Sequence, residues 1–305
     1  LVPADIVSLE PGQQRYSQLL NEDGGIIDDL MVSRSALPGT DGRLYVIVNA
    51  ARKAVDFAHL RARLPDTVTV AERPNWALLA LQGPMAAEVL ERALPGVSRL
   101  AFMAGGPFSS TTAGARSVVY VTRSGYTGED GFEITVANAD VAGLWTMLLD
   151  QPEVLPIGLG ARDSLRLEAG LCLYGHDIDE TTSPIEADLA WIISRRRRAE
   201  GGFPGAERIL KELAEGPARL RVGIRPEGRR PVREGTPIAD DAGRAAGTVT
   251  SGGFGPSLGA PVAMGYVASP AAAEGTVLGL EVRGKTIPAR VAALPFVPHR
   301  YVKTR

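Results

Sequence analysis

The sequence is short of the side chains that usually form disulfides and metal sites. It contains one cysteine, Cys172, and three histidines, His59, His176 and His299. One cysteine excludes an internal disulfide framework and fits a reducing compartment. The histidines lie far apart and lack the spacing of metal ligands, so we expect neither a metal site nor a Cys-His nucleophile.

Long apolar runs and an excess of one charge are also missing. No apolar run approaches the roughly 20 residues that a membrane-spanning helix needs, and the formal net charge is −2. We therefore expect no membrane partner and no nucleic-acid partner. The hydrophobic fraction of 45% is ordinary for a globular protein. A length of 305 residues allows two or three domains.

Two regions of different texture follow one another along the chain. The first starts at Leu1 without a methionine and enters a strand pattern directly, so we expect that a preceding segment of its domain is missing. Up to residue 216, strands and helices mix without a regular βαβ rhythm, which predicts an α+β fold with antiparallel sheets. From 217 to 305, short β-rich runs alternate with Gly/Pro turns, which predicts an all-β barrel or sandwich domain.

The expected elements follow from periodicity and from turn and cap residues. Strands are expected at 15–20, 26–32, 43–48, 67–70, 76–81, 117–122, 132–136, 219–224 and 276–282. Helices are expected at 50–64, 84–94 and 141–149, with Asn49 and Asp140 as caps and Pro84 at a first position. Helical patterns dominate 158–213, where Ser183 and Glu186 have the spacing of a capping box.

The stretch 21–32 carries two adjacent carboxylates within an apolar run. Its turn formers, Asn and paired Gly, predict a β-hairpin with the preceding strand. Alternation puts Asp29 on one face with Ile27 and Met31, and Asp28 on the other with Ile26, Leu30 and Val32. If either face is buried, one carboxylate enters an apolar interior, which is costly without a partner. The alternative is an edge strand with both carboxylates in water.

Two further segments are candidate ligand contacts. The Gly-rich loop 124–131 offers the ring and hydroxyl of Tyr126, although many such loops are plain surface turns. On the helix at 161–170, Glu168 is separated from the other charges and lies among apolar positions, as a ligand anchor would. The alternative is a frayed helix end beside Gly170, where Glu168 reaches water.

Three other features have ordinary explanations beside functional ones. The four arginines at 195–198, which follow Trp191, form either a solvated face or a site for an anion. Cys172 is expected to be a small core residue rather than a nucleophile. The run 248–258 is expected to be a Gly-rich loop of the β domain. Together these residues predict a binder of an anionic, partly aromatic small molecule, with acid/base capacity.

Six strings in order resemble one protein family. They are the runs 21–30, 124–133, 162–170, 174–178, 247–252 and 263–267, which read NEDGGIIDDL, SGYTGEDGFE, RDSLRLEAG, YGHDI, GTVTSG and AMGYV. In this order they resemble the T proteins of the glycine cleavage system, which are tetrahydrofolate-dependent aminomethyltransferases. The likeness extends from Leu1 to Tyr301.

The resemblance implies a fold and a reaction. The fold is an α+β, multidomain cloverleaf with antiparallel sheets, formed by two interleaved subdomains in 1–216, plus a C-terminal barrel or jelly roll in 217–305. The reaction moves an aminomethyl group from the lipoyl arm of H protein to tetrahydrofolate. Its products are methylenetetrahydrofolate, ammonia and the dihydrolipoyl arm. No metal takes part, and the compartment is the cytoplasm of a bacterium or the mitochondrial matrix of a eukaryote.

The resemblance also implies roles for single residues. Asp29, rather than Asp28, matches the catalytic carboxylate beside the folate N10, and Glu168 matches the acid that binds the pterin ring. The other implied folate contacts are Tyr16, Val48, Tyr126, Arg197 and Tyr301.

Relatives on the same scaffold give alternatives. These are folate-dependent demethylases of the dimethylsulfoniopropionate type or the dimethylglycine and sarcosine type. The latter carry a flavin domain whose dinucleotide fingerprint is missing here. A third alternative is a non-enzymatic folate-binding factor for iron–sulfur assembly, which depends on a reactive cysteine motif.

Overall fold

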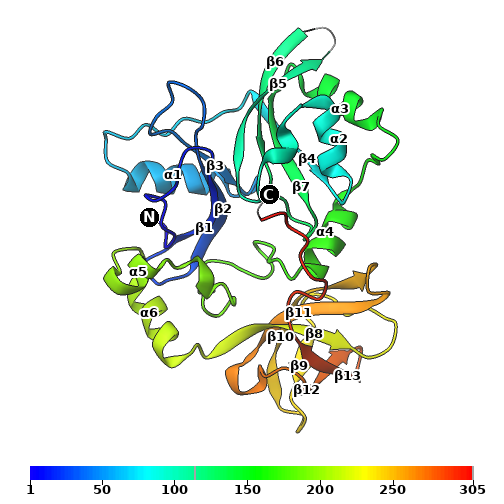
Figure 1. Cartoon of the computed structure of the whole chain (residues 1–305). Helices are drawn as coiled ribbons and strands as arrows, with labels where there is room; N and C mark the ends of the chain where they lie inside the picture. The colour runs from blue at the N-terminus through cyan, green and yellow to red at the C-terminus, as the bar shows by residue number, and fades with distance from the viewer. Residues whose placement is uncertain (113–114, 304–305) are drawn as a thin grey trace.

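The computed structural model describes residues 1–112 and 115–303. Its strands form a three-stranded sheet, a four-stranded sheet and a closed six-stranded barrel. All the pairings between these strands are antiparallel. The three sheets lie in three lobes around a common centre (Figure 1). The predicted α+β cloverleaf with a C-terminal barrel is thereby confirmed.

The first lobe contains the hairpin that carries the paired aspartates. Its elements are β1 (Gln14–Leu20), β2 (Ile26–Arg34), β3 (Leu44–Val48) and helix α1 (Lys53–Arg63). The sheet order is β1-β2-β3, so β2 is central and the edge-strand alternative is wrong. Helix α1 starts later than predicted, and its N-cap is Arg52 rather than Asn49.

A β-bulge corrects the predicted alternation in β2. Leu19 pairs with Asp28 but Leu20 pairs with Ile26, so Ile27 is an extra residue in its strand. Ile26 consequently packs with Leu20 in one core cluster, whereas Ile27 packs with Leu19 in another. The assignment of Ile27 to the face of Asp29 is therefore wrong, because strict alternation fails across a bulge.

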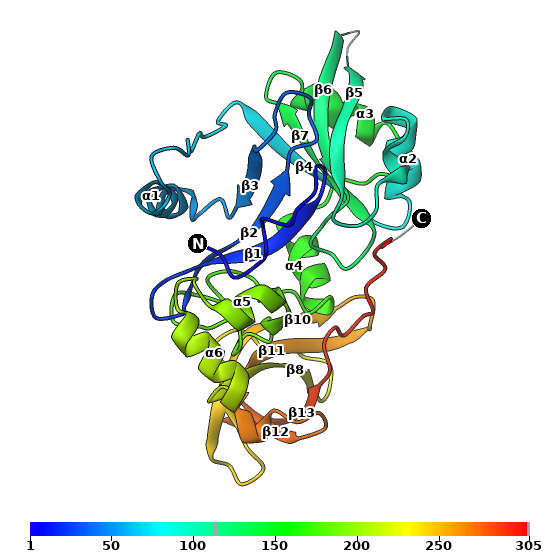
Figure 2. The ribbon, with the colours of Figure 1, turned by 60° about the vertical axis from the view of Figure 1, so that its left-hand side comes forward.

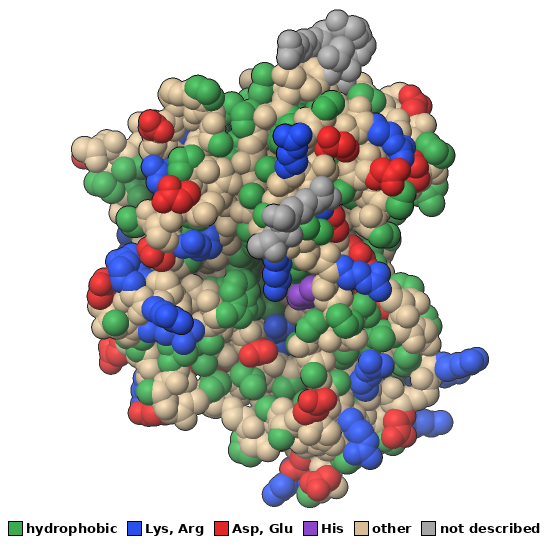
Figure 3. All heavy atoms as spheres, viewed as in Figure 1, with side chains coloured by type: hydrophobic (Ala, Val, Ile, Leu, Met, Phe, Trp, Pro, Cys, Tyr) green, Lys and Arg blue, Asp and Glu red, His purple; other side chains and the backbone are tan. Residues whose placement is uncertain are grey.

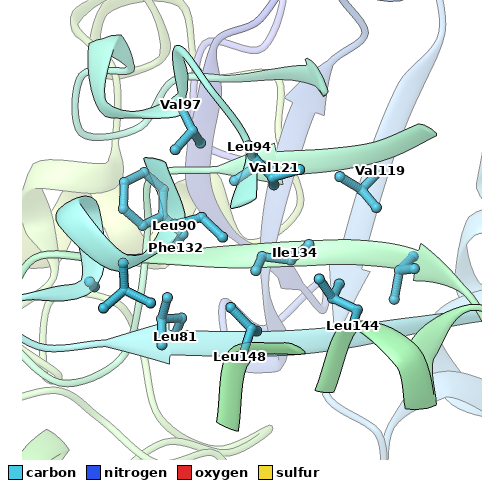
Figure 4. Close-up of a cluster of buried hydrophobic side chains, with 13 residues drawn as sticks. Leu81, Leu90, Leu94, Val97, Val119, Val121, Phe132, Ile134, Leu144 and Leu148 are labelled. Atoms are coloured by element: carbon cyan, nitrogen blue, oxygen red, sulfur yellow. The ribbon is translucent and has the colours of Figure 1, made fainter. Parts of the chain in front are cut away.

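The second lobe is a sheet with two helices on one face. Its strands, in the order β4-β7-β6-β5, are β4 (Trp76–Gln82), β7 (Gly131–Ala137), β6 (Ala115–Thr122) and β5 (Gly105–Thr112). Helices α2 (Ala86–Ala93) and α3 (Val141–Leu149) cover it, with a short 3-10 turn, η1 (Val97–Arg99). Figure 4 shows their shared core, in which Leu90, Leu144 and Phe132 are fully buried.

Several predictions for this lobe need correction. Residues 67–70 form no strand, and Pro84 lies in the turn before α2 rather than within it. Asp140 precedes α3 but makes no side-chain capping bond. Strand β5 was not predicted, because its Gly, Pro, Ser and Thr residues resemble a loop.

The connecting region is less helical than predicted. Its elements are α4 (Leu159–Glu168), η2 (Ala190–Ile192), α5 (Arg195–Glu200) and α6 (Ala206–Glu215). Ser183 and Glu186 exchange the two hydrogen bonds of a capping box, at 3.0 and 3.1 Å. A turn follows instead of a helix, and Asp188 has a positive φ of 57°. The sequence correctly predicts the capping box, but ion pairs of Glu186 with Arg208 and Arg219 hold this segment in a turn.

The third lobe is the barrel, in the order β10-β11-β8-β13-β12-β9. Its elements are β8 (Arg219–Pro226), β9 (Pro237–Ala239), β10 (Ala245–Gly255), β11 (Ala260–Ala268), η3 (Ser269–Ala271), β12 (Val277–Val282) and β13 (Lys285–Ala292). Closure removes free strand edges. Most of the predicted loop 248–258 belongs to strand β10. Its glycines permit close packing, since a Cβ at Gly255 would lie 2.7 Å from the Glu168 carboxylate.

Long-range connections hold the lobes together. Helix α4 lies between the second sheet and the barrel (Figure 2). The C-terminal tail returns from the barrel to the second lobe, where Phe102 N donates to the carbonyl of Val302 at 2.7 Å. No helix among the described residues has the length and apolar character needed to cross a membrane.

Candidate functional site

Asp29 lies where the first sheet faces the centre of the molecule. The Tyr16 hydroxyl on β1 donates to its Oδ2 at 3.0 Å. The Asn49 side-chain amide, just after β3, donates to its Oδ1 at 2.6 Å. Asp29 is half-buried, so it keeps access to solvent although protein surrounds it. Side chains on β1 and just after β3 thus orient the Asp29 carboxylate on β2.

The surroundings of Asp29 raise its pKa and so favour the uncharged, protonated form. Burial is the largest effect and raises the pKa of Asp29 to about 6, and the charge of Asp28 acts in the same direction. The hydrogen bonds from Tyr16 and Asn49 lower the pKa because they favour the ionised form. A carboxyl group with such a pKa can exchange protons near neutral pH.

Asp28 faces the opposite way and is completely buried. Its carboxylate accepts hydrogen bonds from the backbone N–H of Asn49 at 3.0 Å and from the Asn49 amide at 2.9 Å. The fully inward carboxylate of the pair is therefore Asp28, and Asp29 occupies the half-open face. One asparagine bridges the two acids, which explains how both are accommodated inside the protein.

Aromatic side chains lie beside Asp29 and its partner Tyr16. Tyr16 stacks on Trp191, with ring centroids 5.6 Å apart, and the Trp191 ring is largely exposed. Tyr126 donates its hydroxyl hydrogen to the carbonyl of Cys172, and the Arg162 guanidinium lies 4.7 Å from the centre of its ring. Burial raises the pKa of both tyrosines, so they remain hydrogen-bond donors.

The predicted site residues form two groups, with Arg197 and Tyr301 as separate residues. Tyr16 and Asp29 are bonded directly, and the charge of Asp29 contributes to the raised pKa of Tyr126, so Tyr126 lies near it. Val48 is the residue before Asn49 and pairs with Leu30 of β2. Tyr16, Asp29 and Val48 thus belong to the first sheet, and Tyr126 approaches it from the loop between β6 and β7.

Glu168 belongs to a second group, at the junction with the barrel. It is buried and accepts hydrogen bonds from Ser257 N and Oγ, both at 2.8 Å, and from Leu258 N at 3.1 Å. The frayed-end alternative is thereby wrong. A cavity of about 30 Å³ beside Glu168, also lined by Thr127 and Val297, has room for about one water molecule.

Arg197 and Tyr301 make their contacts with other residues. The Arg197 guanidinium donates to the carbonyls of Gly201 and Gly202, and its buried Nε has no partner among the described residues. Tyr301 stacks on Phe102 with ring centroids 4.0 Å apart. Within residues 1–112 and 115–303, no hydrogen bond joins either residue to Asp29.

Two residues of the Asp29 cluster were not predicted for it. Asn49 was assigned to a helix cap, because its position after a strand fits a cap as well as a clamp. Trp191 was noted only as a neighbour of the arginines. An exposed tryptophan is a signal for a binding surface in a structure, but its exposure cannot be read from the sequence.

The centre of the molecule is hollowed on the face shown in Figure 3. Hydrophobic side chains line the hollow between the lobes, and basic side chains lie at its edge. Buried Cys172 is not reactive there, because burial raises the pKa of its thiol to about 12. Among the described residues, no group of three or more His, Cys, Asp or Glu side chains could hold a metal ion.

Two family models match the chain. The GCVT N-terminal domain matches residues 1–197, and the glycine cleavage T-protein C-terminal barrel domain matches residues 219–298. The second match covers the six strands of the barrel.

Named relatives agree with these matches. The mitochondrial aminomethyltransferase of Flaveria trinervia is 43% identical over 312 residues, covering 99% of this chain and 74% of that protein. The mitochondrial aminomethyltransferase of Gallus gallus is 44% identical, covering 99% and 76%. The crystal structure of the glycine cleavage system aminomethyltransferase T from Bartonella henselae superposes with a TM-score of 0.89, at 45% identity, covering 99% and 81%. The chain therefore belongs to the glycine cleavage T-protein family of aminomethyltransferases.

Proposed function

We propose that Asp29 is the acid/base group of an aminomethyl transfer from the lipoyl arm of H protein to tetrahydrofolate. The reaction class follows from the family, and the products are methylenetetrahydrofolate, ammonia and the dihydrolipoyl arm. The observation that carries the role of Asp29 is its setting. It is a half-buried carboxylate with a pKa of about 6, oriented by Tyr16 and Asn49 and lying beside aromatic side chains.

The chemistry needs a fixed negative charge that can also handle a proton. The carbon–sulfur bond breaks, the sulfur leaves as a thiolate that takes up a proton, and a weakly basic folate nitrogen captures the resulting iminium. Ammonia leaves when a second folate nitrogen closes the methylene bridge. An ionised Asp29 stabilises that cation, and its carboxylate accepts the proton that the folate nitrogen loses. Because Tyr16 and Asn49 hold the carboxylate in place, little reorganisation is needed when the charge develops.

We further propose folate contacts from several lobes. Tyr16, Val48 and Tyr126 would flank the folate beside Asp29. Arg197 would offer its unpartnered Nε to an anionic part of the ligand, and Tyr301 would contribute its ring. Three donors occupy Glu168, but a carboxylate has about four acceptor sites. One site therefore remains for a pterin N–H.

We also propose a partner protein and a cellular compartment. The donor of the aminomethyl group would be the lipoylated H protein, and the enzyme would work in a bacterial cytoplasm or in a mitochondrial matrix. The iron–sulfur assembly alternative is disfavoured, because the described thiol at Cys172 is buried and not acidic.

The test is the Asp29→Ala variant. We expect it to lose most of its turnover while largely keeping folate binding, because the carboxylate acts on the reacting atoms rather than on the ring system. Ammonia and methylenetetrahydrofolate would be measured with aminomethylated H protein, and folate affinity by calorimetry.

The control is Asp66→Asn, which removes an exposed carboxylate from a surface turn. It should behave like the parent protein. Near-normal turnover in Asp29→Ala would refute the assignment of Asp29. Ammonia release that depends on neither H protein nor folate would refute the transfer reaction itself and favour a demethylase.

A further inference from the structure

Asp56 is a buried acid that the reaction described above does not use. It is the buried residue of helix α1, with 1% of its surface exposed. Neither of its carboxylate oxygens accepts a hydrogen bond from any residue that the structure describes. An ionised carboxylate in such a place would be strongly unfavourable, so its protonation state needs an explanation.

The group that faces Asp56 is a second carboxylate. Burial is the largest influence and raises the pKa of Asp56 to about 7, followed by the charge and the direct contact of Asp28. Asp29 raises the pKa further, whereas Arg52 lowers it. Two buried carboxylates in contact cannot both ionise near neutral pH, so one proton is held between them.

Arg52, the cation that lowers the pKa of Asp56, makes its own contacts with other groups. The Arg52 Nε donates to the carbonyl of Ile27 at 3.0 Å, and its guanidinium forms an ion pair with Glu180 at 2.5 Å. It also lies 5.1 Å from the centre of the Tyr174 ring. None of these contacts reaches Asp56, so within the described residues Arg52 does not replace the proton.

The location of the proton follows from the hydrogen bonds. Asp28 uses both carboxylate oxygens to accept N–H groups from Asn49, whereas Asp56 accepts none among the described residues. Asp56 is consequently the better place for the proton. The O–H group of protonated Asp56 then donates a hydrogen bond to the carboxylate of Asp28. Both side chains thereby share a hydrogen bond.

We propose that Asp56 is protonated in the active form of the protein and donates this proton in a hydrogen bond to Asp28. The row Asp56, Asp28 and Asn49 then positions the carboxylate of Asp29. This inference rests on the proposed role of Asp29. Asp56 touches no reacting atom, so it is a positioning residue that acts through Asp28 and Asn49.

Loss of this proton has a defined effect on the site. A third negative charge appears inside the first lobe and repels Asp28, which carries both hydrogen bonds from Asn49. The clamp on Asp29 is then disturbed. Turnover should therefore fall as pH rises through the ionisation of Asp56, whereas folate affinity should change little.

The first test compares Asp56→Ala with Asp56→Asn. Asp56→Ala removes the donor and should lower kcat by about 10- to 100-fold, the effect of misplacing a catalytic group. Asp56→Asn keeps a neutral donor of the same shape and should restore kcat to within about threefold of the parent, a small change on the same scale. Its alkaline loss of kcat should also disappear, while KM for folate stays unchanged.

A second test follows the proton without using activity. Infrared spectra of the parent at pH 6 minus those of Asp56→Asn should show the carbonyl band of a neutral carboxylic acid. The parent band should vanish as pH rises above about 8, one unit beyond the pKa cited above. Circular dichroism of each variant checks that the fold is kept, and Asp66→Asn is the control for a lost surface carboxylate.

The outcomes separate this inference from the proposed function. Absence of the carboxylic-acid band, or an unchanged alkaline limb in Asp56→Asn, would overturn the protonated Asp56. Full kcat in Asp56→Ala would overturn its positioning role. Normal turnover in Asp29→Ala would contradict the proposed function, and this result does not depend on the Asp56 variants.

Discussion

At the scale of single residues, the surroundings of Asp29 act on its pKa in opposite directions. Burial raises its pKa, and the Tyr16 hydroxyl and Asn49 amide lower it, with a pKa of about 6 as the balance. The ionised form is the one that stabilises a cation. Activity in the parent protein should therefore rise with pH through about 6 before it declines at the ionisation of Asp56.

Replacement of Tyr16 tests this balance. Tyr16→Phe removes a hydrogen bond that favours the carboxylate, so the pKa of Asp29 should rise and the acid limb of kcat should move to higher pH. The pKa of Asp29 should shift by about 0.5 to 1 pH unit, because one hydrogen bond contributes about 1 kcal/mol. The measurement is the pH profile of kcat. The control is Tyr45→Phe, which removes a hydroxyl from a ring packed on Tyr120. An acid limb of kcat that does not move in Tyr16→Phe would contradict the role of the Tyr16 hydroxyl.

The same ionisations affect stability with a definite sign. The folded-state pKa values of Asp29 and Asp56, at about 6 and about 7, lie above the ordinary value of 3.8 for an aspartate. The folded state therefore binds more protons than the unfolded state in this window. Their contribution to stability is present at low pH and is lost as pH rises from about 4 to about 7.

At the scale of elements, the β1–β2 hairpin depends on a close approach between chain segments. A Cβ at Gly25 would lie 1.7 Å from the carbonyl oxygen of Glu180. Glu180 O also accepts a hydrogen bond from the Asn21 amide at 2.9 Å. The hairpin that carries Asp28 and Asp29 is thus fixed against the connecting region.

Gly25→Ala should therefore lower the free energy of unfolding by roughly 2–4 kcal/mol, because backbone must move to admit the methyl group. Urea denaturation measures the effect. Gly106→Ala is the matched control, since a Cβ there meets nothing within 4 Å. Equal stabilities of the two variants would show that the hairpin is not held in this way.

At the scale of the whole molecule, a buried ion pair and its hydrogen bonds to strand β10 join the barrel to the rest. Arg166 of α4 contacts Asp177 at 2.8 Å, and both are almost completely buried. Ser251 and Thr250 of β10 donate their hydroxyl hydrogens to the same carboxylate at 2.8 and 2.5 Å. The network thus crosses from the helix to the barrel.

Asp177→Ala removes the fully buried charge partner of Arg166 and leaves it only the exposed Asp163, at 2.8 Å. We expect a loss of about 3–5 kcal/mol in the free energy of unfolding, as for other broken buried pairs. Calorimetry should also show the barrel melting separately from the first two lobes. Glu88→Ala removes an exposed partner of Arg92 and should cost less than about 1 kcal/mol. A similar small loss in Asp177→Ala would show that the network does not couple the lobes.

The sequence by itself determined the fold class, the family and most of the strands. Local signals were sufficient for these, because alternation, turn residues and ordered motifs act over short distances. The division at 216 and the folate contacts remain predictions. The sequence also singled out Asp29, through its resemblance to the family, but without the partners that define its chemistry.

Only the tertiary structure decided how the paired acids are used. The bulge at Ile27 sends its side chain to a different core from that of Ile26, and Asn49 leaves its expected cap to bridge Asp28 and Asp29. The contact of Asp28 with Asp56 joins residues 28 positions apart in the chain. Local patterns cannot encode such contacts, because the free energy of a buried charge depends on the groups that the whole fold brings around it.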